Sequence, residues 1–253
     1  MQHATDTIAL ESTLRFSIDK WAAWSPSLPA PADWNDWLQH PFPLQETGEG
    51  SPTLAEMPAT LRRRASRCGR AALQAAYWCE PGDAPIVFAS RYGEIARSVE
   101  MLEQLAQNEP LSPTAFSLSV HNAIGALFSI ARNRPDNYTA IAAGEETVEA
   151  AFTEAVGLLA DGAPQVTVVY YEAPLPEVYG RFERPGAMTH AWACRIVPAV
   201  SGGCTLAPEP AAECCAEDDL PADLHILRLL TGNGDARYAH RSGARGWQWR
   251  RHD

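Results

Sequence analysis

The chain has 253 residues, of which 46% are hydrophobic and 20% are charged, and its formal net charge is −11. Such a composition is typical of a soluble globular protein that buries a sizeable core, and we expect a single domain over residues 1–253. The acidic balance disfavours a nucleic-acid partner, because an acidic surface repels the phosphate backbone.

Membrane insertion and secretion are also disfavoured. No apolar run approaches the roughly 20 residues that a membrane span needs, and the first residues, MQHATDTIALESTL, lack the basic flank and apolar stretch of a secretory signal. We therefore expect a cytoplasmic protein.

Its cysteines are too thinly spread for a disulfide framework and form no CxxC pair, so we expect neither a metal site nor a bound cofactor. They are Cys68, Cys79, Cys194, Cys204, Cys214 and Cys215.

Residues 25–60 are rich in proline, which fixes φ and removes a backbone donor. This segment is predicted to be irregular and to wrap around the domain. It contains Trp34 and Trp37, whose indoles we expect to pack on the body of the protein.

Buried strands and amphipathic helices alternate through the middle of the chain. Continuous apolar runs predict strands over residues 86–89, 138–142 and 166–170. Apolar residues at helical spacing predict helices over residues 61–79, 94–106 and 148–159. This alternation is typical of βαβ crossovers, so the predicted fold class is α/β, with a mostly parallel mixed sheet and helices on both faces.

The C-terminal part is predicted to be a strand and helix extension. Residues 191–197 have the pattern of a further strand, residues 224–230 that of a short helix, and residues 247–251 alternate like an edge strand. Between them, residues 201–221 combine glycine, proline and acidic residues, which predicts an exposed, mobile acidic loop.

One segment is unusual for its polar groups. Residues 111–130 contain no charged side chain, yet they include hydroxyls, an imidazole and an amide. Such groups need hydrogen-bond partners if they are buried, so the segment is expected to meet a pocket, a partner or the backbone.

Reactive groups in an α/β sheet lie where a strand turns into a helix, and residues 90–94 and 143–146 form such turns here.

Three motifs carry a resemblance to a known family. The sequences LRRRASRCGRAAL (61–73), VFASRYGE (87–94) and SPTAFSLSVHNA (112–123) resemble the short β-ketoacyl synthase-like (N-terminal domain) family. Its members are chain length factors of aryl polyene and xanthomonadin-type pigment pathways. The resemblance implies a thiolase-like fold, of which this chain supplies about the N-terminal half.

The same resemblance implies that the chain does not condense acyl groups alone. Alignment of the turn after residues 138–142 places Glu145 at the position of the nucleophilic cysteine, with Gly144 as the neighbouring alternative. A carboxylate cannot carry the thioester, and the motifs that hold the two catalytic histidines are missing. In the simpler interpretation, Glu145 and Glu146 are only acids that favour a helix N-terminus.

The implied function is that of a non-catalytic subunit that pairs with a full-length ketosynthase and shapes its acyl pocket. Bulky side chains would close the end of that pocket, and the predicted wall is formed by Phe116, Leu118, Ile124 and Phe128. The partner interface is predicted to include these residues together with Ser119, His121 and Asn122.

Other interpretations stay open. Ser119 and His121 could serve a free-standing acyl-thioester hydrolase or acyltransferase if they share the face of a strand, or His121 could simply bond to backbone groups. The chain could also be a scaffold for pathway proteins. An arginine cluster could dock an acidic acyl carrier protein or be merely a solvated helix face. It consists of Arg62, Arg63, Arg64, Arg67 and Arg70.

Overall fold

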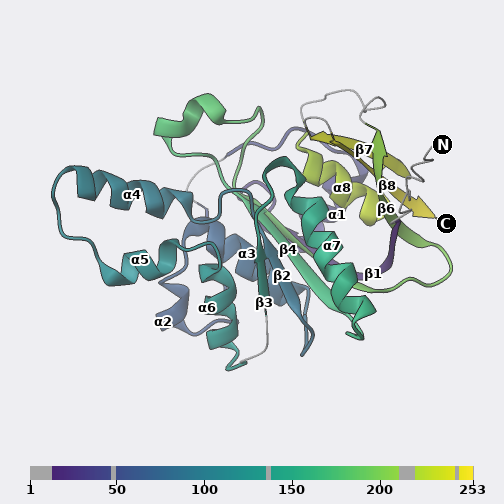
Figure 1. Cartoon of the computed structure of the whole chain (residues 1–253), viewed down its shortest axis with the longest axis horizontal. Coiled ribbons are helices and arrows are strands. Elements are labelled where there is room, and N and C mark those ends of the chain that lie inside the picture. Colours follow the sequence, from purple (N-terminus) through teal and green to yellow (C-terminus); the bar gives the residue numbers. More distant parts are fainter. Residues whose placement is uncertain (1–12, 47–49, 135–137, 211–219, 243–244, 253) are drawn as a thin grey trace, which may run out of the picture.

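The computed structural model describes residues 13–46, 50–134, 138–210, 220–242 and 245–252. Within these ranges, eight strands form one sheet with the order β3-β2-β4-β5-β1-β6-β8-β7 (Figure 1). The strands are β1 (Leu14–Trp24), β2 (Ile86–Ala89), β3 (Tyr138–Ile141), β4 (Val166–Glu172), β5 (His190–Pro198), β6 (Gly203–Pro210), β7 (Arg237–Ser242) and β8 (Arg245–His252).

The sheet is mixed, and its parallel part is smaller than predicted. Strand β2 pairs in parallel with β3 and with β4. The other neighbouring pairs, from β4·β5 to β8·β7, are antiparallel. The α/β class is therefore confirmed, but the expectation of a mostly parallel sheet is wrong, because the N-terminal and C-terminal strands extend the parallel core with antiparallel neighbours.

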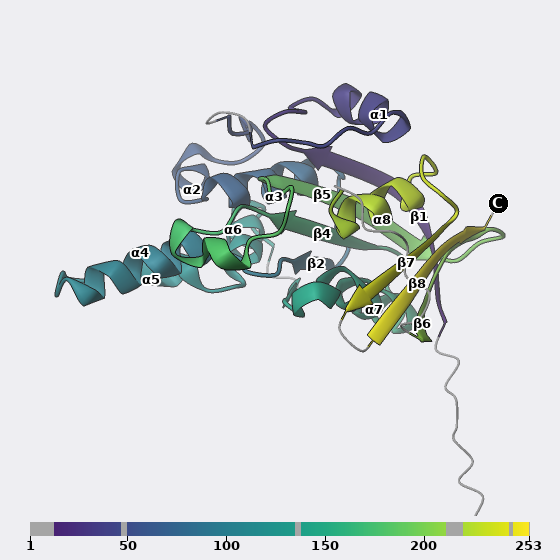
Figure 2. The ribbon, with the colours of Figure 1, turned by 90° about the horizontal axis from the view of Figure 1, so that it is seen from above.

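Helices cover both faces of the sheet (Figure 2). On one face, α7 packs in a core with α1 and α8, and on the other face α3 and α6 pack in a second core. Alternate residues of β2 and β4 enter the two cores, as expected for strands that are buried on both sides. The helices are α1 (Pro31–Gln39), α2 (Ala59–Arg62), α3 (Arg67–Trp78), α4 (Ile95–Ala106), α5 (Pro113–Ser119), α6 (Ala123–Ala131), α7 (Thr147–Ala160) and α8 (Ala222–Leu230), with 3₁₀ turns η1 (Gly144–Glu146) and η2 (Glu177–Phe182).

The helix predicted over residues 61–79 is interrupted. Helix α2 ends at Arg62 and α3 begins at Arg67, because Ser66 caps α3. The Ser66 Oγ atom accepts a hydrogen bond from the backbone N–H of Gly69 at 2.9 Å. The break separates most of the arginine cluster from the helix on which it was expected.

The proline-rich segment is fixed to the body by its tryptophans. Trp34 and Trp37 are buried in α1, and their indole N–H groups donate to the carbonyls of Leu28 and Phe42. Each indole therefore contributes apolar area to the core while its one polar group is satisfied.

Two predictions for the C-terminal part need correction. Residues 203–210 form strand β6, which pairs with β1 and β8. These residues therefore do not belong to the mobile acidic loop that was expected over residues 201–221. Residues 211–219 of that predicted loop lie outside the described part of the chain. Strand β8 is not an edge strand, because it lies between β6 and β7.

A buried carboxylate ties the C-terminal strands to helix α7. The Glu149 Oε1 atom lies 2.8 Å from Nδ1 of His240 on β7 and accepts the indole N–H of Trp249 on β8 at 3.1 Å. Because Glu149 is fully buried, these two bonds compensate for part of the cost of removing its charge from water.

No single helix among the described residues is long and apolar enough to cross a membrane. Helices α5 and α6 reach the required length and hydropathy only as a pair, and they are bent by 101° at their junction.

Candidate functional site

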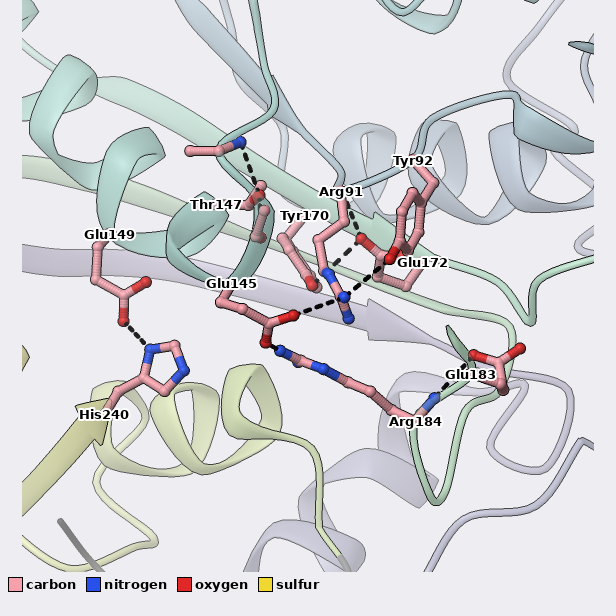
Figure 3. Close-up of polar contacts among 12 residues, drawn as sticks. Arg91, Tyr92, Glu145, Thr147, Glu149, Tyr170, Glu172, Glu183, Arg184 and His240 are labelled. Atoms are coloured by element: carbon pink, nitrogen blue, oxygen red, sulfur yellow. Dashed lines mark hydrogen bonds and ion pairs between the residues drawn. The ribbon is translucent and has the colours of Figure 1, made fainter. Parts of the chain in front are cut away.

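A cluster of charged side chains forms where β2, β3 and β4 end. Because these strands are parallel, their carboxyl ends meet at the same edge of the sheet. Arg91 follows β2, Glu145 lies on the turn after β3, and Glu172 is the last residue of β4. Figure 3 shows these side chains pointing toward one another.

The turn that carries Glu145 is held by its own backbone and by the first residue of α7. Gly144 has φ of +58°, a left-handed conformation that favours glycine. The backbone N–H of Ala143 donates to Oγ1 of Thr147 at 3.0 Å, and this hydroxyl donates to the carbonyl of Gly144 at 2.7 Å. The strand-to-helix turn expected from the sequence is thus present, and Glu145 projects from it.

Glu145 lies between two guanidinium groups. Its Oε1 atom accepts from Nη2 of Arg91 at 2.7 Å, and its Oε2 atom pairs with Nη2 of Arg184, which comes from the segment between η2 and β5 (Figure 3). The ion triad therefore links three separate segments of the chain.

Burial distinguishes Glu172 from Glu145. The Glu172 Oε1 atom accepts the backbone N–H of Arg91 at 2.5 Å and the hydroxyl of Tyr170 at 3.4 Å. Burial raises the pKa of Glu172 to about 7, although the Arg91 backbone bond and the Arg91 charge act in the opposite direction. The carboxyl group can therefore change charge near neutral pH.

A second buried pair lies beside Glu172. The His190 Nε2 atom is 2.8 Å from Oδ2 of Asp223, which lies in the first turn of α8. The same oxygen accepts the indole N–H of Trp192 at 3.0 Å. Burial opposes charge on both groups, but the negative charge and hydrogen bond of Asp223 raise the pKa of His190. His190 in turn lowers the pKa of Asp223 against the effect of burial.

These groups line a pocket between the sheet edge and the segment before β5. Its apolar wall comes from Ala173, Pro185, Ala187 and Met188. Its polar wall is formed by Arg91, Tyr92, Tyr170, Glu172, Glu183, Arg184, His190 and Asp223. The arrangement can hold a small anionic or mixed polar and apolar group.

Ser119 and His121 do not form a hydrogen-bonded pair in the described part of the structure. They do not share a strand, because α5 ends at Ser119, whose hydroxyl donates to the carbonyl of Phe116. The His121 Nε2 atom lies 2.9 Å from the carbonyl of Ile141, and the ring packs on Gly93. This geometry favours the structural interpretation of His121, which joins the α5–α6 turn to the end of β3.

The residues predicted to form the pocket wall separate into two groups. Ile124 and Phe128 on α6 are buried in the core of this chain, whereas Phe116 on α5 is 63% exposed and Leu118 is half-buried. Asn122 is exposed at the start of α6. Of these four wall residues, only Phe116 and Leu118 on α5 thus offer apolar surface to another molecule.

The arginine cluster also separates into residues that bind the rest of the chain and residues that are exposed to solvent. Arg62 donates to the carbonyls of Thr53 and Leu54, and Arg67 donates to that of Gly50 at 2.8 Å, so both fix the preceding segment. Arg70 is half-buried, with its Nε atom enclosed. Arg63 and Arg64 are exposed and remain available for docking.

Sequence reasoning missed several residues of this site. Arg184, His190 and Asp223 belong to no motif and are brought together only by the connections around β5 and α8. Arg91 lies within a motif quoted above, but no role followed from it. Glu172 gave one usable signal, because a carboxylate that directly ends a buried apolar strand requires partners.

Comparison with known proteins gives a consistent picture. A family model described as "Beta-ketoacyl synthase, N-terminal domain" matches residues 34–250. None of the curated proteins compared with the chain matches it.

Solved structures give matches over most of the chain. The chain is similar to one in the complex of the ketosynthase ApeO with its chain length factor ApeC from Xenorhabdus doucetiae, with a TM-score of 0.79, 25% identity and coverage of 94% of this chain and 100% of that chain. A beta-ketoacyl synthase from Burkholderia phymatum STM815 matches with a TM-score of 0.58 and 12% identity, over 88% of this chain and 71% of that chain. The ishigamide ketosynthase/chain length factor matches with a TM-score of 0.55 and 14% identity, over 78% of this chain and 68% of that chain. The last two similarities concern the fold alone.

Proposed function

Because the chain belongs to the family of beta-ketoacyl synthase N-terminal domains, we propose that it is a chain length factor, a ketosynthase-like subunit that forms no carbon–carbon bonds by itself. It pairs with a full-length ketosynthase and shapes the pocket that holds the growing acyl chain. The similarity to a complex of a ketosynthase with its chain length factor supports this assignment. The aryl polyene type of pathway is what the sequence resemblance implies.

The observation that carries the proposal is the carboxylate of Glu145 on the turn between β3 and α7. Condensation needs a thiolate to accept and release the acyl group. Glu145 is instead engaged by Arg91 and Arg184. The four described cysteines are buried, and burial raises the pKa of each thiol, for Cys79 to about 12.

The partner surface is the exposed apolar side of helices α4 and α5. Both helices extend away from the body of the molecule (Figures 1 and 2). The exposed apolar side chains on these helices are Leu102, Leu105 and Phe116, and those of Leu111 and Val120 flank α5. A concentration of exposed apolar residues marks an interaction surface, and it includes the α5 part of the predicted pocket wall.

Reconstitution tests the proposal. The chain, a cognate ketosynthase and an acyl carrier protein are purified, and products are measured by mass spectrometry with each component omitted in turn. We expect elongation only when the ketosynthase is present, and a change in product length when this chain is omitted. Bond formation or thioester hydrolysis by the isolated chain, or an acyl group covalently attached to it, would contradict the proposal.

A further inference from the structure

A groove with a volume of about 610 Å³ runs along the outer face of helix α7. The end of β3, at Ile141, bounds it on one side, and Arg245 and Trp247 at the start of β8 bound it on the other. We call it the α7 groove. It shares no described lining residue with the pocket beside Glu172.

Helix α7 lacks the polar outer face of a surface helix. Of its 14 residues only Glu149 and Glu154 are charged, and Glu149 is fully buried. Toward the groove the helix presents small and apolar residues, among them Gly157 and Leu158. A helix that is apolar on all sides is normally covered on all sides, so we expect another element to cover this face.

The length and shape of the α7 groove suit a second helix. Its lining follows the chain from Glu146 to Asp161, a distance of about 20 Å at 1.5 Å per residue. Ala150 and Gly157 are seven residues apart and lie on the same side of α7. A Cβ atom at Gly157 would meet no atom within 4 Å. Small side chains two turns apart allow another helix to approach closely.

The α7 groove is acidic. The carboxylates of Glu146, Glu154 and Asp161 line it, against the guanidinium group of Arg245. Arg245 pairs with Glu146 at 3.0 Å. Glu154 accepts the hydroxyl of Thr139 at 3.2 Å, but the described residues provide no ion-pair partner for Glu154 or Asp161. These two carboxylates are about 10 Å apart along the helix axis, so basic side chains two turns apart on a docked helix would complement them.

A hydrogen-bond donor on the groove wall also lacks an acceptor. The Nε1 atom of Trp247 is buried, and none of the residues that the structure describes accepts a hydrogen bond from it. A buried N–H group without an acceptor is unfavourable. An occupant that brings a carbonyl or side-chain oxygen to this wall would satisfy it.

We propose that the α7 groove binds a basic helix of another protein, whose contact face carries small residues and two lysine or arginine residues two turns apart. A second copy of this chain is a poor occupant, because its net charge of −11 would bring carboxylates against carboxylates. The groove lies apart from helices α4 and α5 (Figures 1 and 2). The proposal therefore does not depend on pairing with a ketosynthase, and its failure would leave the proposed function untouched.

A synthetic helical peptide tests the groove. The probe is alanine-rich, with two lysines on one face at the spacing of Glu154 and Asp161 and with glutamine on the opposite face. A second peptide carries glutamate in place of both lysines. Binding of each labelled peptide to the isolated chain is measured by fluorescence anisotropy. We expect the lysine peptide to bind at least tenfold more tightly than the glutamate peptide, with the difference decreasing as ionic strength rises.

Removal of the two free carboxylates tests the charge complementarity. Glu154→Gln combined with Asp161→Asn should abolish most of the preference for the lysine peptide. Glu177→Gln combined with Asp36→Asn makes the same change in net charge at exposed acids outside the groove. This control should keep the wild-type preference.

Filling the groove tests its shape. Gly157→Leu should weaken binding of the lysine peptide at least tenfold, because the leucine occupies the open space beside Gly157. Ala160→Leu is the matched control, since it adds the same side chain to an exposed position of α7 that does not line the groove. It should bind the peptide as the wild type does. If circular dichroism shows that Gly157→Leu is unfolded, Thr153→Leu replaces it with the same expectation, because Thr153 also lines the groove.

Three results would overturn the proposal. The first is equal binding of the two peptides, or no binding of either, by the wild-type chain. The second is undiminished affinity for the lysine peptide in a folded variant whose groove is filled. The third is a dimer of the wild-type chain that Gly157→Leu dissociates in sedimentation, because the groove would then belong to a second copy.

Discussion

The Nε2 atom of His190 lies 2.8 Å from Oδ2 of Asp223, in the interior between β5 and α8. The other ring nitrogen, Nδ1, lies 3.1 Å from the carbonyl of Met188. A carbonyl and an ionised carboxylate can only accept hydrogen bonds, so both ring nitrogens carry protons and His190 is an imidazolium. Helix α8 is therefore attached to the sheet by a buried ion pair.

Asp223→Asn should lower the free energy of unfolding by about 3 to 5 kcal/mol at pH 6, because it leaves the His190 charge buried without its partner. Chemical denaturation measures the effect, with the exposed Asp161→Asn as a control that should change little. The stabilisation by His190 is fully present below its unfolded pKa near 6.5 and is lost as the pH rises through the raised folded pKa. A loss from Asp223→Asn that is no greater than in the control would refute the buried pair.

Glu172→Gln should remove a pH dependence of stability. The folded pKa of Glu172 is about 7 and its ordinary value is 4.5, so the folded state binds the proton more tightly. Wild-type stability should therefore fall as the pH rises from 4.5 to 7, with a contribution from this group on the order of 3 kcal/mol.

Denaturation at pH 5 and pH 8 measures this contribution. The gain in stability of Glu172→Gln relative to the wild type should be greater at pH 8 than at pH 5. The exposed Glu177→Gln serves as a control and should leave the slope unchanged. Parallel pH curves for the wild type and Glu172→Gln would contradict the raised pKa.

Phe116 and Phe128 should respond differently to truncation. Phe128→Ala should lower the free energy of unfolding by about 3 to 5 kcal/mol, because the ring packs on Tyr77 and Phe88 in the core. Phe116→Ala should change stability by less than about 0.5 kcal/mol, because its ring is exposed. In the reconstituted system, Phe116→Ala should weaken pairing or lengthen the product, and a variant with neither effect would exclude Phe116 from the partner surface.

Arg63→Glu combined with Arg64→Glu should weaken binding of an acyl carrier protein at low salt, with the difference from the wild type decreasing as ionic strength rises. Both side chains are exposed. The exposed Arg15→Glu on β1 is the control for Arg63→Glu alone, because these two single variants make the same change in charge. Surface plasmon resonance at several salt concentrations measures the effect, and an equal response of both variants would attribute binding to net charge alone.

Gly93→Ala should lower the free energy of unfolding by more than about 1 kcal/mol. Gly93 has φ of +56°, and a Cβ atom there would lie 2.6 Å from Nδ1 of His121. Gly144→Ala is a matched control, because Gly144 has φ of +58° but no neighbouring atom within 4 Å of such a Cβ. The excess loss in Gly93→Ala should disappear in the His121→Ala background; if it persists, contact with His121 is not its cause.

The central strands could be predicted from sequence because their signal is local. Residues 86–89 are apolar without interruption, and β2 has these same bounds. Strand β1 was not predicted, because the charged residues Asp19 and Lys20 interrupt its apolar pattern. In the structure, the pairing of β1 with β5 has a register shift at this point, between Ile18 and Lys20. Strand β6 was missed because Pro208 and Pro210 normally indicate a break. Both strands depend on pairing with distant partners, which no local pattern reveals.

The sequence by itself determined that an acidic turn follows a strand, because the run over residues 138–142 and the helical pattern after it leave Glu145 at the junction, although β3 is a half-buried edge strand and not the buried strand expected. Only the tertiary structure decided what that carboxylate does. Arg91 and Arg184 are 93 positions apart, and they meet at Glu145 because β2 and β3 are parallel neighbours and the segment before β5 returns across their ends. Charges separated by this much chain interact only when the fold brings them within a few ångströms, since water and salt screen them at longer range.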